Sequence, residues 1–257
     1  MIIGIVSGKG GVGKTTIASN LSYYLSLVGK NVTLIDCNLT TSHLNFSFGF
    51  FNATNTLNNV LRGEKNVKEV IYKYQNLNII LASVRLEDLN YIDIISLKNI
   101  TRKIDSEYVI LDSAPGFGRE AISVLNSVDT VLLVTTPNIA SIADIIRAKK
   151  ILGELNIFPL GIIVNMVKWK KHELKKREIE EITGIKVIEE IPYDENVETA
   201  LSLGKPFIEI YPYSPAAISI KRLCNKIFGV YFEEKKLGLT QNFFKIIKSL
   251  GEKIKIS

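Results

Sequence analysis

The sequence is poor in residues that support cysteine-based chemistry. Among 257 residues there are two cysteines, Cys37 and Cys224, which lie far apart and form no C-x-x-C spacing. Two histidines, His43 and His172, have no companions at metal-ligand spacing. This pattern excludes a disulfide framework. With no basic, apolar leader of the signal-peptide type near Met1, it favours a cytoplasmic protein.

Long hydrophobic runs are missing as well. No apolar run approaches the roughly 18 residues that a membrane-spanning helix needs, so any membrane contact is expected to be peripheral. There are no internal repeats and no linker rich in proline and glycine. The formal net charge is +6, which favours anionic partners such as a nucleotide, a nucleic acid or an acidic lipid surface.

The sequence contains short apolar runs that are rich in β-branched residues. They lie at 2–6, 31–35, 77–81, 108–111, 130–134, 160–164 and 186–191, with helical patterns between most of them. Runs that are apolar on both faces are typical of strands buried in a parallel sheet. The alternation predicts a doubly wound, three-layer α/β/α domain with a mostly parallel sheet of about seven or eight strands. We expect this domain to span residues 1–231, followed by a separable tail at 232–257.

The first helix is clear from its pattern. Ile17, Leu21, Leu25 and Val28 share one predicted face with Tyr24, and Gly29 follows as a stop signal.

A phosphate-binding loop precedes this helix. Residues 8–15 read G-K-G-G-V-G-K-T, which satisfies the G-x-x-x-x-G-K-[ST] pattern between a strand and a helix. Glycines let backbone N–H groups turn toward phosphates, and the start of the helix adds partial positive charge. Lys14 is expected to reach the β- and γ-phosphates and the Thr15 hydroxyl to ligate Mg²⁺. The candidate phosphate-binding residues are Gly8, Lys9, Gly10, Gly11, Val12, Gly13, Lys14, Thr15 and Thr16.

Lys9 is a second lysine in a loop that needs only one. Its position in "GKGGVGKTT" resembles the deviant Walker A motif of the MinD/ParA ATPases, and the resemblance is closest to archaeal and bacterial MinD. It extends over roughly residues 1–228. In that family the extra lysine crosses a dimer interface to the partner's nucleotide, so the resemblance implies an ATP-dependent homodimer. From the residue alone, a contact of Lys9 with its own phosphates stays open.

Two aspartates follow predicted strands of this sheet. Asp112 ends the apolar run of "YVILDSAPGFG", which resembles Walker B leading into switch II. An aspartate at the carboxyl edge of the sheet, beside the phosphate loop, suits Mg²⁺ coordination through water. The resemblance makes Asp36, in "LIDCNLTTSHLNFSFGF", a switch I carboxylate. Thr15, Asp36 and Asp112 are the candidate metal residues, and no metal other than Mg²⁺ is assigned.

Nucleotide recognition is implied further along the chain. "IIVNMV" at 162–167 and "IPYDENVETAL" at 191–201 resemble the two adenine-side segments of the family. Asn165 is the candidate for base recognition, with Pro192, Asp194 and Val197 near the ring. The guanine-type N-K-x-D motif is absent, which favours ATP over GTP. The segment 56–72 resembles the family's helical insertion.

Asn38 departs from the family pattern. The family usually has a second aspartate at this position, which orients the attacking water, whereas an amide carries no charge and cannot accept a proton. Loss of a positioned acid–base group typically costs about 10² to 10⁴ in rate. We therefore expect slow ATP hydrolysis, with Lys9, Lys14, Asp36 and Asn38 as the candidate catalytic residues. A neutral replacement compensated nearby is the alternative.

The tail carries an amphipathic pattern over 239–257. Leu239, Phe243, Ile246, Ile247, Leu250 and Ile254 share a helical face, and lysines lie on or near the opposite side. An interfacial membrane helix needs this pattern, and the resemblance implies such a membrane-targeting helix. A terminal helix docked on the protein's own core is the alternative.

The resemblance as a whole implies a MinD-like switch that binds Mg²⁺-ATP and organises an unidentified protein partner, at the membrane, in cell division or positioning. The basic run "KWKKHELKKRE" at 168–178 keeps a ParA-like, DNA-associated partitioning ATPase open, although most such runs are solvated faces. A nearly inactive, ATP-bound scaffold is a third possibility.

Overall fold

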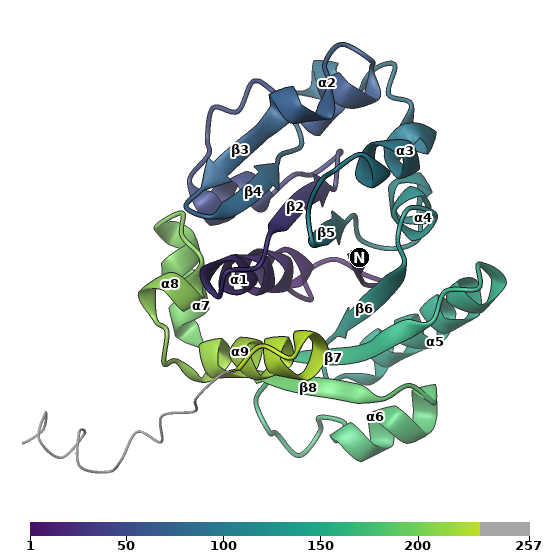
Figure 1. The fold of residues 1–257 in the computed structure, drawn as a ribbon. Coiled ribbons are helices and arrows are strands. Elements are labelled where there is room, and N and C mark those ends of the chain that lie inside the picture. Colours follow the sequence, from purple (N-terminus) through teal and green to yellow (C-terminus); the bar gives the residue numbers. More distant parts are fainter. Residues whose placement is uncertain (232–257) are drawn as a thin grey trace, which may run out of the picture.

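The computed structural model describes residues 1–231, and its centre is one twisted sheet of eight strands (Figure 1). The strand order is β3-β4-β2-β5-β1-β6-β7-β8. The strands are β1 (Ile2–Val6), β2 (Val32–Cys37), β3 (Ile71–Tyr74), β4 (Leu77–Ile80), β5 (Tyr108–Ser113), β6 (Thr130–Thr135), β7 (Pro159–Val167) and β8 (Val187–Pro192). All neighbours pair in parallel except β3 and β4. The predicted mostly parallel α/β sheet is confirmed.

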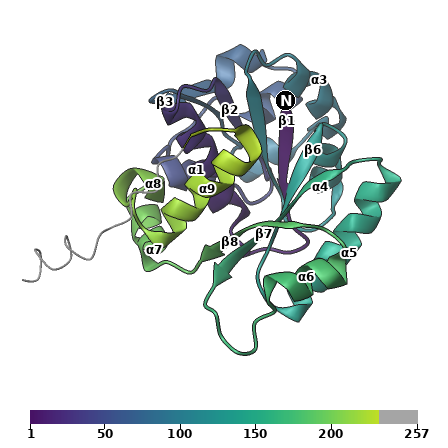
Figure 2. The same cartoon turned by 60° about the horizontal axis from the view of Figure 1, so that its bottom comes forward.

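Helices cover both faces of the sheet and complete the three layers. They are α1 (Lys14–Leu27), α2 (Leu57–Leu61), α3 (Leu97–Arg102), α4 (Arg119–Leu125), α5 (Ile139–Glu154), α6 (Lys176–Thr183), α7 (Glu195–Ser202), α8 (Phe207–Ile210) and α9 (Pro215–Phe228). Short 3₁₀ helices lie at η1 (Leu44–Phe48), η2 (Val67–Val70), η3 (Leu86–Leu89) and η4 (Ile94–Ser96). One apolar core joins α1, α8 and α9 to the sheet, and two others lie under α2 to α6 on the opposite face (Figures 1 and 2).

The central strands are buried along their whole length. Every residue of β1, β2 and β6 is buried, as expected for a sheet with helices on both faces. Because β1 lies between β5 and β6, the loop after β1 opens at the middle of the carboxyl edge of the sheet. Open α/β sheets bind ligands at this carboxyl edge of their strands.

Two local predictions are corrected. Segment 56–72 is not one helical insertion, since it holds only the short α2 and η2 and then enters the antiparallel edge strand β3. Ile71 and Tyr72 pair with Ile80 and Ile79, so pairing at the sheet edge determines the structure here. Val28 does not share the buried face of α1, because it is the exposed C-cap residue of that helix.

The first helix is more enclosed than an amphipathic pattern suggests. Its polar residues Ser19, Asn20 and Ser22 are buried together with the apolar ones, because α9 and α8 pack against α1. Asn20 accepts a hydrogen bond from the backbone N–H of Ile208 at 3.0 Å, which ties α1 to α8. The segment after the phosphate loop is therefore anchored on several sides.

Among the helices of residues 1–231, none is both long and apolar enough to cross a bilayer. The predicted amphipathic helix at 239–257 lies outside the described residues.

Candidate functional site

The phosphate loop connects β1 to α1, with Gly13 as the N-cap residue of the helix. The Lys14 Nζ donates a hydrogen bond to Ser7 Oγ at 2.9 Å, and Ser7 Oγ donates to the backbone oxygen of Lys9 at 2.7 Å. Lys14 is buried, and this burial lowers the pKa of its ammonium while the nearby Asp112 carboxylate acts in the opposite direction. A hydrogen bond within the phosphate loop therefore fixes the position of the Lys14 ammonium.

Two of the loop glycines are required by close approach. Gly13 has a φ of 91°, and a Cβ at this position would lie 2.3 Å from Asn165 Nδ2. A Cβ at Gly8 would lie 2.3 Å from Cβ of Asp144 in α5. These contacts place the ends of the loop against β7 and α5.

Asp36 and Asp112 are paired residues on the adjacent parallel strands β2 and β5. Neither carboxylate oxygen of Asp112 has a hydrogen-bond partner among the described residues, although both are buried. Burial raises the pKa of Asp112 to about 7, with Asp36 adding to the shift, while the nearby Thr15 hydroxyl and Lys14 ammonium oppose it. A buried carboxylate without a partner is costly, so this position fits a cation or its bound water.

Asp36 is already engaged by its own loop. Its Oδ1 accepts from the backbone N–H of Asn38 at 3.0 Å, and its Oδ2 accepts from the Ser42 hydroxyl at 2.6 Å. Burial raises the pKa of Asp36 to about 6, and these hydrogen bonds oppose the shift. Asp36 thus fixes the fold of the segment after β2.

The side-chain amide of Asn38 is also occupied. Its Nδ2 donates to the backbone oxygen of Thr41 at 2.6 Å, and its Oδ1 accepts from the Thr41 hydroxyl at 3.0 Å. Asn38 lines the phosphate cavity, but both ends of its amide face the same residue, Thr41.

The cavity in front of the phosphate loop has a volume of about 870 Å³. One wall is the loop and the first turn of α1, and the other is the segment after β2. The lining residues are Gly10, Gly11, Gly13, Lys14, Thr15, Thr16, Asn38, Thr41, His43, Ser47, Pro115 and Leu201. Lys9 is not among these described residues; it is half-buried, and its side chain makes no hydrogen bond or ion pair within residues 1–231.

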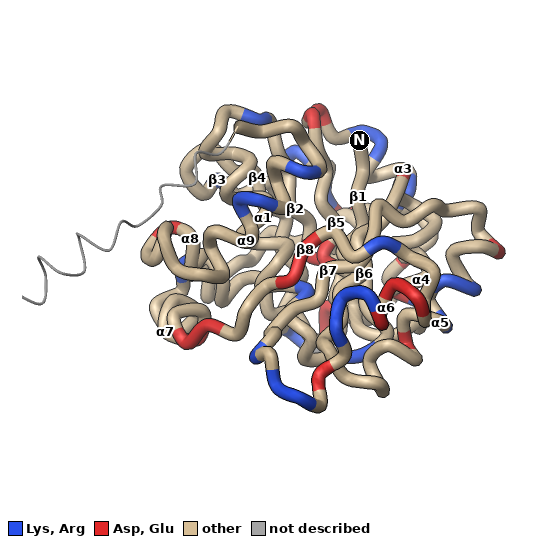
Figure 3. The backbone as a smooth tube through the Cα atoms, turned by 90° about the horizontal axis from the view of Figure 1, so that it is seen from below, with Lys and Arg blue, Asp and Glu red and all other residues tan. Residues whose placement is uncertain are grey.

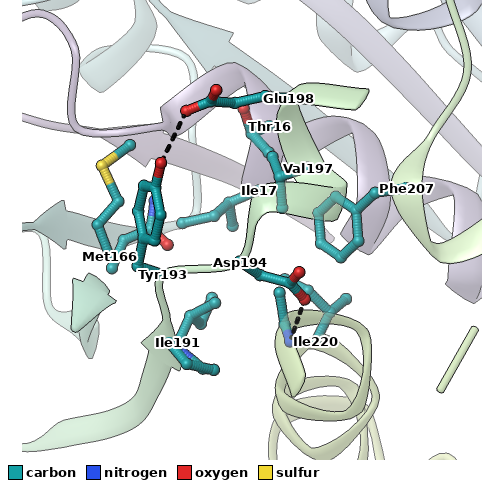
Figure 4. Close-up of a pocket in the computed structure, with 13 residues that line it drawn as sticks. Thr16, Ile17, Met166, Ile191, Tyr193, Asp194, Val197, Glu198, Phe207 and Ile220 are labelled. Carbon is teal, nitrogen blue, oxygen red and sulfur yellow. Dashed lines mark hydrogen bonds between the residues drawn. The ribbon is translucent and has the colours of Figure 1, made fainter. Parts of the chain in front are cut away.

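A second, more apolar cavity of about 480 Å³ shares Thr16 with the first. Figure 4 shows the residues that line this second cavity. All four residues predicted on the adenine side line it: Asn165, Pro192, Asp194 and Val197. Ile17, Phe207 and Ile220 supply apolar surface, and Met166 and Tyr193 lie at its edge. The two cavities together match the polar and apolar halves of a nucleotide.

Asn165 and Asp194 have structural bonds as well. Asn165 Nδ2 donates to the backbone oxygen of Val12 at 2.9 Å, which links β7 to the phosphate loop. Asp194 is the N-cap residue of α7, where its Oδ1 accepts from the backbone N–H of Asn196, and its Oδ2 accepts from the backbone N–H of Ala216 in α9 at 3.2 Å. Asp194 therefore joins two helices at the wall of the cavity.

Some cavity residues escaped the sequence reasoning. His43 and Ser47 line the phosphate cavity, while Met166, Tyr193 and Phe207 line the second one. His43 and Ser47 lie in the segment that resembles switch I, and Met166 and Tyr193 lie in the two adenine-side segments, but the resemblance gives these positions no role of their own. Phe207 lies in the short helix α8, outside every quoted segment. The position of His43 a few residues after a strand that ends at the phosphate edge was the one signal available.

Comparison with known proteins supports this arrangement. The ParA family model, described as an NUBPL iron-transfer P-loop NTPase, matches residues 1–228. Two uncharacterized ATP-binding proteins of Methanocaldococcus jannaschii are 34% and 35% identical to the chain, with 96% and 97% of both chains covered, respectively. The septum site-determining protein MinD of Pyrococcus horikoshii, solved with Mg-ADP, superposes with a TM-score of 0.84 at 27% identity, covering 93% of this chain and 97% of that one.

Iron transfer is part of the description of the family model and is not assigned to this chain. Within residues 1–231 both cysteines are buried, and no group of three or more His, Cys, Asp or Glu side chains is placed to hold a metal ion. Burial raises the pKa of the Cys37 thiol well above its usual value, with the Asp36 and Asp112 carboxylates adding to the shift. The family match over residues 1–228, the two relatives above 30% identity and the superposition on MinD agree with the loop and sheet described above. The chain therefore belongs to the MinD/ParA family of P-loop ATPases.

Proposed function

We propose that the chain is a MinD-like ATPase switch. It binds Mg²⁺-ATP, dimerises around the nucleotide, hydrolyses it slowly and organises protein partners in space, at the membrane, in cell division or positioning. The observation that carries this proposal is the pair of buried Asp112 oxygens, which have no hydrogen-bond partner within residues 1–231 and lie near Lys14, a lining residue of the cavity beside the apolar pocket.

Each half of the double cavity has residues suited to one part of ATP. Lys14 and the backbone N–H groups of 10–15 would bind the phosphates, and the apolar pocket around Ile17 and Val197 would take the adenine. Asp112, through water, and the Thr15 hydroxyl would hold Mg²⁺, which neutralises charge on the phosphates. Asp36, whose two oxygens each accept one hydrogen bond within the loop, would add negative charge next to Mg²⁺ and keeps acceptor sites for a water of the ion.

Nucleotide binding is tested by calorimetry with Mg²⁺-ATP, and with ATP in EDTA. We expect binding that weakens without Mg²⁺ and is lost in Lys14→Ala, because that change removes the only lysine among the described residues that line the cavity. Lys170→Ala, at an exposed lysine of the loop before α6, is the matched control and should bind as the native chain does. Equal affinity of Lys14→Ala and the native chain would contradict the site.

Slow hydrolysis follows from Asn38. Its amide cannot accept a proton, and both of its polar ends are bound to Thr41. We expect Asn38→Asp to raise the steady rate of phosphate release about 10-fold or more, because it restores an acid–base group at this position. If the native chain already turns over at about one per minute and the aspartate adds nothing, Asn38 is a compensated replacement.

Membrane attachment would depend on the tail at 239–257. One short helix binds lipid weakly, whereas an ATP-linked dimer presents two, and the second binds at high effective concentration. Cosedimentation with anionic vesicles should therefore be stronger with ATP than with ADP, and should be lost when 239–257 is deleted. Equal binding in all of these conditions would rule out this role.

A ParA-like, DNA-associated role is the second candidate. Lys and Arg gather on the loop before α6 and on its first turn (Figure 3). Lys168, Lys170, Lys171, Lys175 and Arg177 are exposed there. Salt-dependent binding of duplex DNA in ATP, lost when these residues are changed to alanine, would favour this role over the membrane role.

A nearly inactive, ATP-bound scaffold is the third candidate, favoured by the occupied amide of Asn38. Single-turnover hydrolysis distinguishes it from the switch, because the scaffold would leave bound ATP intact.

A further inference from the structure

His43 has no role in the functions discussed so far, yet it lines the phosphate cavity. It lies seven positions beyond Asp36 and directly before η1. It therefore belongs to the wall formed by the segment after β2, which faces the wall formed by the phosphate loop. Lys14 and His43 are the two described residues of that lining whose side chains can carry a positive charge. A polyphosphate placed in the cavity would thus meet one nitrogen-bearing donor side chain from each wall.

The His43 ring is free to act as a donor. It is exposed, it packs against Phe46 with ring centroids 6.3 Å apart, and neither ring nitrogen makes a hydrogen bond within residues 1–231. Asn38 and Thr41, its neighbours on the same wall, use their side chains on each other. His43 and Ser47 are therefore the residues on this wall whose side chains make no hydrogen bond within residues 1–231, whereas the Asn38 amide keeps only its second N–H.

Hydrogen bonds to Asp36 hold the wall that carries His43 in place. Asp36 accepts from Asn38 and Ser42, on either side of the turn that leads to His43. The backbone oxygen of His43 accepts from the N–H of Phe46 at 3.2 Å. A ring carried on such a fixed turn can meet a ligand without a large loss of backbone entropy.

We propose that His43 is a phosphate-contacting residue that donates a hydrogen bond to the polyphosphate of the bound nucleotide from the wall opposite the phosphate loop. This inference rests on the proposed nucleotide-binding function. His43 would supply a phosphate contact from the segment after β2, whose fold is already fixed by the hydrogen bonds that Asp36 accepts.

The test uses the full chain and compares Mg²⁺-ADP, Mg²⁺-ATP and adenosine. His43→Phe keeps a planar ring against Phe46 but removes both nitrogens, and His172→Phe, at an exposed site before α6, is the matched control. Hydrogen bonds to charged groups are individually strong, so we expect His43→Phe to weaken ADP and ATP binding about 10-fold and to leave adenosine binding unchanged. His172→Phe should bind all three as the native chain does.

A second test, by NMR of the histidine ring protons, uses a chain in which His43 is unchanged. The chain has only two histidines, so its ring proton signals can be assigned by comparison with His172→Phe. Mg²⁺-ADP and inorganic pyrophosphate should shift the His43 signals and leave those of His172 in place, whereas adenosine should shift neither. Two results would overturn the proposal and leave nucleotide binding intact. One is His43 signals that do not shift under saturating Mg²⁺-ADP. The other is an ADP affinity of His43→Phe within about twofold of the native value. No binding of Mg²⁺-ADP by the native chain would overturn both.

Discussion

At the scale of single residues, the site depends on groups that are expensive to bury. Asp112 is the clearest case, since its carboxylate is buried beside Asp36 and has no hydrogen-bond partner within residues 1–231. The sequence predicted that Asp112 would lie at this edge, because parallel strands bring their carboxyl ends together. It could not predict that Asp36 would accept hydrogen bonds from Asn38 and Ser42, because those bonds depend on the path of one turn.

Asp112→Asn tests the cost of this burial. The pKa of Asp112 is raised from 3.8 to about 7, so its ionised form is disfavoured in the folded state. The penalty is absent below the unfolded-state pKa of 3.8, still small at about pH 4, grows as the pH rises toward 7, and is complete at about pH 8. The ligand-free Asp112→Asn chain should therefore melt at a higher temperature than the native chain at about pH 8 and close to it at about pH 4.

Calorimetric melting at the two pH values, without Mg²⁺, checks this prediction. The variant should also lose the thermal stabilisation that Mg²⁺-ATP gives the native chain. A variant that is less stable than the native chain at about pH 8 would show that Asp112 is stabilised by a partner.

Gly13→Ala tests the close approach at the phosphate loop. Both the φ of 91° and the 2.3 Å separation between a Cβ and Asn165 Nδ2 oppose an alanine. A left-handed backbone costs about 1–2 kcal/mol for an L residue, and overpacking about 1–3 kcal/mol more. Gly11→Ala, with a φ of 76° and no atom of the described residues within 4 Å of its Cβ, should show the backbone cost alone.

Urea unfolding of the two variants measures the difference between these sites. The combination of Gly13→Ala with Asn165→Ala should recover part of the loss, since it removes the clashing amide. Equal destabilisation by Gly11→Ala and Gly13→Ala would mean that Asn165 moves aside without cost.

At the scale of elements, the prediction was best where patterns are strongest. All seven predicted strands exist, since runs that are apolar on both faces belong to a covered parallel sheet. The edge strand β3 was missed because residues 71–74 are only partly buried and gain their structure by pairing with β4. Burial of the polar side of α1 was also beyond the sequence, because α8 and α9 come from the far end of the domain.

Asp194 is the element-scale connection that we expect to matter most for the apolar cavity. It caps α7 and also accepts from Ala216 at the start of α9. Loss of an N-cap side chain costs about 0.5–2 kcal/mol, so Asp194→Ala should destabilise the domain by about 2 kcal/mol, given the second bond. It should also weaken ATP binding, because both helices line the cavity.

The comparison for this prediction is Ser214→Ala, which removes the N-cap hydrogen bond to Ala217 and the contact of Ser214 with Asp194, and leaves the bonds of Asp194 to Asn196 and Ala216 in place. Chemical unfolding and ATP titration of both variants give the result. If Asp194→Ala is no more destabilising than Ser214→Ala, the carboxylate does not hold the two helices together.

At the scale of the whole molecule, the account is one of a switch made from two chains. The double cavity of one chain contains Lys14, while Lys9 makes no side-chain hydrogen bond or ion pair within residues 1–231 and does not line the phosphate cavity. Such a side chain is suited to reach a nucleotide in a second subunit. The fold and the phosphate loop were predictable from local patterns, whereas this role depends on an assembly that no pattern within one chain specifies.

The most direct test of this account is the mass of the protein in solution, measured by light scattering with ADP, with ATP and with a slowly hydrolysed ATP analogue. We predict a mass near the 28.7 kDa of one chain in ADP and twice that mass in the analogue. Lys9→Ala should bind the analogue and stay at the mass of one chain, while Lys170→Ala should dimerise normally. Normal dimerisation of Lys9→Ala, or a native chain whose mass is the same with every nucleotide, would contradict the central claim.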